Sequence, residues 1–164
     1  MRNVFNLRSR FEQAEMASLS APALEGDRCR SILVIVDGNE PSRRAAAYAV
    51  GLAQRQALRL VVLYVHTLGP FGATVDGIHA MRVANAEAFG DLELEMDRQA
   101  RALGVDIAVV EREGSPYLET MRLAGDLCVD AVVMAAGRNF GHHFLGSPVT
   151  RIVREARCPV TVVP

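Results

Sequence analysis

The sequence contains no lysine and no tryptophan, and it has only three cysteines among its 164 residues. All 18 basic residues are therefore arginines. The absence of lysine excludes Schiff-base chemistry, attachment of pyridoxal phosphate and a Walker-type phosphate loop, because each of these needs a lysine amine. The formal net charge of −1 provides no basic field to hold nucleic acid, so we expect no nucleic-acid partner.

The three cysteines, Cys29, Cys128 and Cys158, lack the C-x-x-C spacing of redox and metal motifs. A chain of this length buries enough surface to fold without disulfides, so we expect a reducing compartment. No apolar run approaches the ~20 residues that a membrane span needs. The sequence therefore predicts a cytoplasmic protein without a membrane partner.

Continuous apolar runs alternate with amphipathic segments along most of the chain. The runs cover residues 31–36, 60–65, 105–110, 130–135 and 159–163. Such runs are typical of parallel strands that are covered on both faces. The pattern predicts an α/β fold with a five-stranded parallel sheet and helices on both faces.

Proline and serine mark the starts of three predicted helices. Pro41-Ser42, Ser115-Pro116 and Ser147-Pro148 supply N-caps or first-turn prolines. A longer helix of about two dozen residues follows the glycines at 69, 72 and 77. The predicted inward stripes, in chain order, are Ala45, Tyr48, Ala49 and Leu52; Met81, Ala84, Ala88, Leu92 and Met96; Leu118 and Met121; and Val149, Ile152, Val153 and Ala156.

Residues 1–28 differ from the rest. Val4, Leu7, Phe11 and Ala14 have helical spacing, and a linker-like segment follows them. We expect a helical or partly ordered extension that packs on the domain or on a partner, followed by one domain over residues 29–164.

Ligands of parallel α/β sheets bind beyond the carboxyl ends of the strands. Asp37 follows the first predicted strand at this edge, and two interpretations remain open. The carboxylate accepts a hydrogen bond from a ribose hydroxyl or a base amine, or it caps its own turn.

The loop after the fourth predicted strand is rich in glycine. Gly137, Gly141 and Gly146 let the backbone approach a ligand closely, and Ser147 opens a helix whose N-terminus favours an anion. The alternative is an ordinary loop with a good N-cap. The adjacent residues His142-His143 have diverging side chains, which disfavours a shared metal ion. The sequence has no catalytic motif, so we expect no enzyme, or at most a slow nucleotide hydrolase.

The two ends of residues 29–164 carry a family resemblance. Val36-Asp37-Gly38-Asn39-Glu40-Pro41-Ser42 resembles the opening of the universal stress protein domain. Gly146-Ser147, the segment 151–157 and Cys158-Pro159-Val160-Thr161-Val162-Val163 resemble its ending. The resemblance implies a Rossmann-like sheet of the adenine nucleotide alpha hydrolase-like type, with strand order 3-2-1-4-5, and a homodimer formed through the last strand.

That family divides into members that bind ATP, with Mg²⁺, and members that do not. Only eight residues separate Gly137 from Gly146, fewer than in the glycine pattern of the binders. The nucleotide-binding residues that the resemblance implies are Asp37 and Gly38 near the adenosine, Val65 in the adenine pocket, and Gly137, Gly141, Gly146 and Ser147 around the phosphates. The sequence thus favours a dimeric stress-response module that binds an adenine nucleotide through a shortened loop. The alternative is a protein-interaction adaptor of the same fold that binds no nucleotide.

Overall fold

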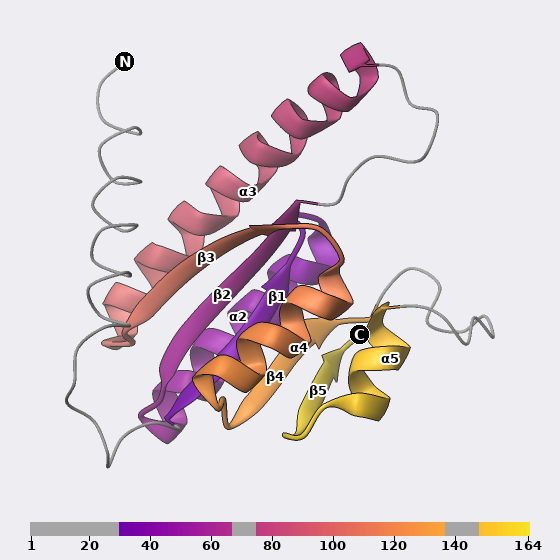
Figure 1. The fold of residues 1–164 in the computed structure, drawn as a ribbon. Coiled ribbons are helices and arrows are strands. Elements are labelled where there is room, and N and C mark those ends of the chain that lie inside the picture. Colours follow the sequence, from indigo (N-terminus) through magenta and orange to yellow (C-terminus); the bar gives the residue numbers. More distant parts are fainter. Residues whose placement is uncertain (1–29, 67–74, 137–147) are drawn as a thin grey trace.

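The computed structural model describes residues 30–66, 75–136 and 148–164 (Figure 1). The elements are β1 (Ser31–Val36), α2 (Glu40–Gln56), β2 (Arg59–His66), α3 (Val75–Leu103), β3 (Ile107–Glu113), α4 (Pro116–Leu127), β4 (Ala131–Ala135), α5 (Pro148–Glu155) and β5 (Val160–Val163). Strands and helices alternate throughout, as the apolar runs predict.

The five strands form one parallel sheet with the order β3-β2-β1-β4-β5. This order confirms the predicted fold class. β1 pairs with β2 on one side and with β4 on the other, so that Val34 lies opposite both Val62 and Val133. The strand order reverses at the β1–β4 boundary, which is the place where sheets of this kind bind ligands.

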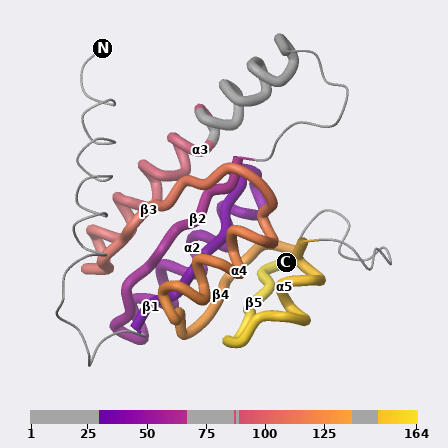
Figure 2. Tube along the Cα trace, in the orientation of Figure 1, coloured from indigo at the N-terminus to yellow at the C-terminus, as the bar shows by residue number. Residues whose placement is uncertain are grey.

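Helices cover both faces of the sheet (Figures 1 and 2). α2 and α3 pack on one face, where Ala49 and Leu92 are buried against Ile32 and Val62. α4 and α5 pack on the other face, where Leu123 and Ile152 belong to a second core with Leu33, Leu63 and Val132. Neighbouring residues of β1 and β2 enter opposite cores, which explains why both strands are apolar at nearly every position between Ser31, Arg59 and His66 at their ends.

The end of α3 determines where β3 begins. Gly104, with a φ of 68°, ends α3, and the Val105 N–H donates to the Ala100 carbonyl at 2.8 Å. Val105 therefore belongs to the end of the helix, and β3 begins at Ile107. The strand continues to Glu113 because its polar end pairs with His66 of β2. The prediction of a third strand over 105–110 was thus wrong at both bounds.

Three residues predicted to face inward are exposed. Tyr48 is 42% exposed, Leu118 is 59% exposed and Val153 is 48% exposed. On α4 the buried stripe contains Tyr117 and Leu123 instead, because this side of the helix meets the sheet and α5. The periodicity was correct, but the inward face is centred about one residue away.

Candidate functional site

The described part of the candidate site lies where β1 and β4 end at the carboxyl edge of the sheet. The turn after β1 leads directly into α2, and α5 follows the loop after β4. That loop, with Gly137, Gly141, Gly146, Ser147 and the pair His142-His143, lies outside the described residues. The structure thus describes Asp37, Gly38 and Val65 of the predicted site.

A hydrogen-bonded turn fixes Asp37 at the end of β1. Its Oδ1 accepts from the Asn39 backbone N–H at 3.1 Å, and its Oδ2 accepts from Asn39 Nδ2 at 2.7 Å. Gly38 lies between them, buried, with a φ of 81° that favours glycine. The structure therefore shows the turn interpretation of Asp37. The side chain remains exposed, and a carboxylate has about four acceptor positions, so the turn leaves capacity for a further donor.

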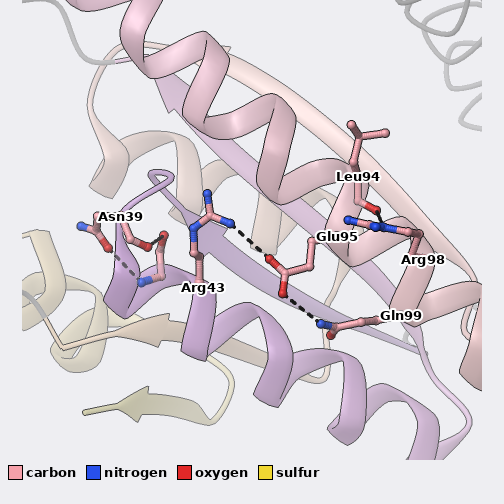
Figure 3. Close-up of polar contacts among 7 residues, drawn as sticks. Asn39, Arg43, Leu94, Glu95, Arg98 and Gln99 are labelled. Atoms are coloured by element: carbon pink, nitrogen blue, oxygen red, sulfur yellow. Dashed lines mark hydrogen bonds and ion pairs between the residues drawn. The ribbon is translucent and has the colours of Figure 1, made fainter.

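The same turn starts α2. Asn39 is the N-cap, and its Oδ1 accepts from the Ser42 N–H at 2.9 Å. The Ser42 hydroxyl donates to the Asn39 carbonyl and accepts from the Asp37 N–H at 3.4 Å. One turn later, Arg43 pairs with Glu95 of α3 at 3.1 Å, as Figure 3 shows. The turn is therefore hydrogen-bonded to the start of α2, and an ion pair joins α2 to α3.

At the carboxyl end of β2, successive side chains lie on opposite faces of the sheet. Val65 is 8% exposed and packs in the core under α4 and α5. Tyr64 faces α2 and α3, where its ring stacks on Phe89 with centroids 4.1 Å apart. Burial raises the pKa of Tyr64 above its ordinary value, with further contributions from Glu111 and Asp37. The phenol therefore lies within electrostatic reach of the turn carboxylate.

Sequence reasoning missed a histidine–carboxylate pair beside this tyrosine. His66 Nε2 lies 2.8 Å from Glu111 Oε2, and the His66 ring meets the Tyr64 ring edge-on at 4.6 Å. In the sequence His66 is an isolated histidine. The available signal was the two-residue spacing of Tyr64 and His66, which places them on one face of a strand, but Glu111 joins them only through the β2–β3 register.

A second polar cluster joins α4 to α5 near the same edge. The Arg151 guanidinium lies over the Tyr117 ring, with Cζ 3.7 Å from the ring centroid. The Tyr117 hydroxyl donates to Glu155, and this hydrogen bond is the main reason why the pKa of Tyr117 is raised. Arg151 Nε also lies 3.8 Å from Glu155 Oε1. Sequence reasoning used Arg151 only as part of a motif.

Other chemistry receives little support from the described residues. No three His, Cys, Asp or Glu side chains among them are arranged to hold a metal ion. Burial raises the pKa of the Cys158 thiol, which disfavours the reactive thiolate. No helix in the described segments is long and apolar enough to cross a membrane.

Comparisons with known proteins agree with this fold. The model of the universal stress protein family matches residues 29–164. Universal stress protein MJ0531 of Methanocaldococcus jannaschii is 28% identical over 138 residues, which are 82% of this chain and 81% of that protein.

Two solved structures in particular are similar. A universal stress protein in complex with cAMP has a TM-score of 0.64 and 19% identity, and the match covers 82% of this chain and 97% of that one. The universal stress protein of Archaeoglobus fulgidus in complex with dAMP has a TM-score of 0.55 and 18% identity, with the same two coverages. At these identities the likeness shows a shared fold.

Proposed function

Because the chain belongs to the universal stress protein family, we propose that it is a stress-response protein that binds an adenine nucleotide between the Asp37 turn and the start of α5. The observation that carries this proposal is the exposed carboxylate of Asp37 at the β1–β4 boundary, held in place by Asn39. A fixed carboxylate at this point suits the hydroxyl donors of a ribose. The cAMP and dAMP complexes of two structural neighbours support the same ligand class.

The described residues fit a nucleoside better than a magnesium triphosphate. Asp37 suits the sugar, whereas Val65 packs in the core under α4 and α5 and presents little surface to a base. No described cluster of carboxylates suits Mg²⁺, which would be held by the phosphates themselves. The short spacing from Gly137 to Gly146 provides fewer N–H donors. Losing two or three charge-assisted hydrogen bonds of ~1.5–3 kcal/mol each would change micromolar ATP binding to millimolar or weaker.

Calorimetric titration of the purified chain with adenosine, AMP and Mg-ATP tests the proposal. We expect saturable binding of adenosine and AMP, with Mg-ATP not tighter than AMP. Asp37→Asn should weaken all three ligands about equally because it changes the ribose contact, whereas Asp126→Asn on the exposed surface of α4 should change none. The absence of heat and of thermal stabilisation at millimolar concentrations of all three would refute nucleotide binding.

The second candidate is an interaction protein without a nucleotide. It is favoured by one observation: both Asp37 oxygens already accept hydrogen bonds from Asn39 within their own turn. The titration above separates the two candidates. For either candidate we expect no turnover, and phosphate release from Mg-ATP above the buffer rate would contradict this.

We also propose that the protein forms a homodimer through β5. Among the residues that the structure describes, β5 pairs only with β4, so no described strand pairs with its outer edge. Its four side chains, Val160–Val163, are each partly exposed. Two exposed apolar side chains lie on α2, which contacts β5, and on α5, which precedes it. Tyr48 is on α2, one turn after Arg44, whose Nε donates to the carbonyl of Pro164 directly after β5. Val153 is on α5, on the side of the helix away from Tyr117.

Light scattering during gel filtration tests the dimer. We expect twice the mass of the chain, and we expect Tyr48→Arg to shift the species toward monomer. Leu94→Arg, at an exposed apolar position on α3, is the matched control and should leave the mass unchanged. A monomer at high micromolar concentration would refute the proposal.

A further inference from the structure

The seam between α4 and α5 lies over the β1–β4 boundary. α4 packs on β1 and β2, and the inward residues of α5 share a core with β4 and β5. Figure 1 shows the two helices side by side on this face. The carboxyl end of the seam is therefore close to the place where the proposed nucleotide site lies.

Arg151 projects into this seam from the first half of α5. It is the fourth residue of the helix, and helical side chains tilt toward the N-terminus, so the guanidinium is carried back toward the carboxyl edge. Its flat face lies over the Tyr117 ring at 3.7 Å. Stacking of this kind orients the guanidinium. Arg151 also forms a hydrogen bond with the Tyr117 side chain, and because a guanidinium has five N–H groups, further donors remain for a ligand.

The ion pair that Arg151 makes is weak. Its Nε is 3.8 Å from Glu155 Oε1, beyond hydrogen-bond distance, and the two side chains are 47% and 49% exposed. The Tyr117 hydroxyl already donates to the other oxygen of Glu155. Arg151 is thus a positioned cation that can exchange Glu155 for a stronger anionic partner.

Other arginines near this edge have closer partners. Arg43 forms a 3.1 Å ion pair with Glu95, and Arg44 donates to the Pro164 carbonyl at 3.1 Å. Arg112 donates to the Glu111 carbonyl at 3.2 Å on the far side of the sheet. These contacts make Arg151 the best suited of these arginines to a ligand.

We propose that Arg151 binds the phosphate of an adenine nucleoside monophosphate, with Tyr117 as the platform that positions it. This inference rests on the proposed function and names the phosphate-recognition residue of that site. A guanidinium binds a phosphate through two parallel hydrogen bonds, so Arg151 alone can hold a monophosphate group firmly. Arg151 thereby gives the site a preference for a phosphorylated nucleoside over a free nucleoside.

Titrations of AMP and adenosine against Arg151→Gln, Arg151→Lys and Arg154→Gln test the proposal. We expect Arg151→Gln to weaken AMP by at least about tenfold and to change adenosine by less than twofold. Arg151→Lys keeps the charge without the planar fork and should fall between Arg151→Gln and the unaltered chain. Arg154→Gln, an exposed residue three positions later on α5, should leave both ligands unchanged.

The outcomes separate this inference from the proposed function. If the unaltered chain binds neither adenosine nor AMP, the proposed function fails and this inference fails with it. If both bind and Arg151→Gln leaves AMP unchanged, or weakens adenosine as much as AMP, the assignment of Arg151 alone is refuted. Circular dichroism of each variant shows whether a loss of binding reflects a loss of fold, and Arg151→Lys keeps the test decisive if Arg151→Gln does not fold.

Discussion

Replacing Asn39 with alanine should lower the free energy of unfolding, because the Asn39 side chain makes two hydrogen bonds in the turn between β1 and α2. The substitution removes the side-chain cap on the Ser42 N–H at 2.9 Å and the bond from Nδ2 to Asp37 at 2.7 Å. Loss of an N-cap typically costs ~1 kcal/mol, and loss of an exposed hydrogen bond to a charged group adds a fraction of this, giving roughly 1–2 kcal/mol in total. For a chain of this size, this lowers the Tm by about 3–6 °C.

Ser115→Ala is the matched control because Ser115 occupies the N-cap of α4 without a side-chain hydrogen bond to the helix. Its expected cost is below ~0.5 kcal/mol. Urea unfolding followed by far-ultraviolet circular dichroism at one protein concentration measures both, since the chain has no tryptophan for fluorescence. Equal losses in the two variants, or a larger loss in Ser115→Ala, would refute the capping argument.

Three further predictions concern the cores and the titratable groups. Ile152→Ala should lower the free energy of unfolding by ~2–5 kcal/mol because Ile152 is fully buried, whereas Leu118→Ala should cost less than ~0.5 kcal/mol in the same urea assay. Folding raises the pKa of the Tyr64 hydroxyl above 10.0, so the unfolded chain loses the phenolic proton at a lower pH than the folded chain. The free energy of unfolding should therefore fall as the pH rises past about 10, and Tyr64→Phe should flatten this part of the pH profile. Maleimide labelling at pH 8 followed by peptide mapping should modify the exposed Cys128 faster than Cys158, whose pKa burial raises, and the reverse order would contradict the burial argument.

The sequence predicted the sheet well because its strands are buried on both faces. The run from Ser31 to Val36 is apolar at nearly every position, and the observed β1 has the predicted bounds. β3 was harder to place, since its second half is polar and is defined by pairing with β2. Helical periodicity predicted that each helix has one inward stripe. On α4 it did not show whether Leu118 or Tyr117 faces inward, because that depends on where α5 packs.

The candidate site was less predictable than the fold. Asp37 was identified from its place after the first strand, yet two roles fitted the sequence, and the bonds to Asn39 are visible only in three dimensions. The contacts of Arg151 with Tyr117 and of His66 with Glu111 join residues 34 and 45 positions apart. Such contacts depend on strand register and helix packing, which a local pattern does not encode.

The two borders of the sheet differ, and this difference limits how copies of the chain can assemble. β3 ends in Glu111, Arg112 and Glu113, whereas β5 is Val-Thr-Val-Val throughout. Charged side chains on a border strand discourage a neighbouring chain from adding its own strand. If the proposed association through β5 occurs, it joins two copies and then stops, because the charged β3 border of each copy does not favour the addition of a third.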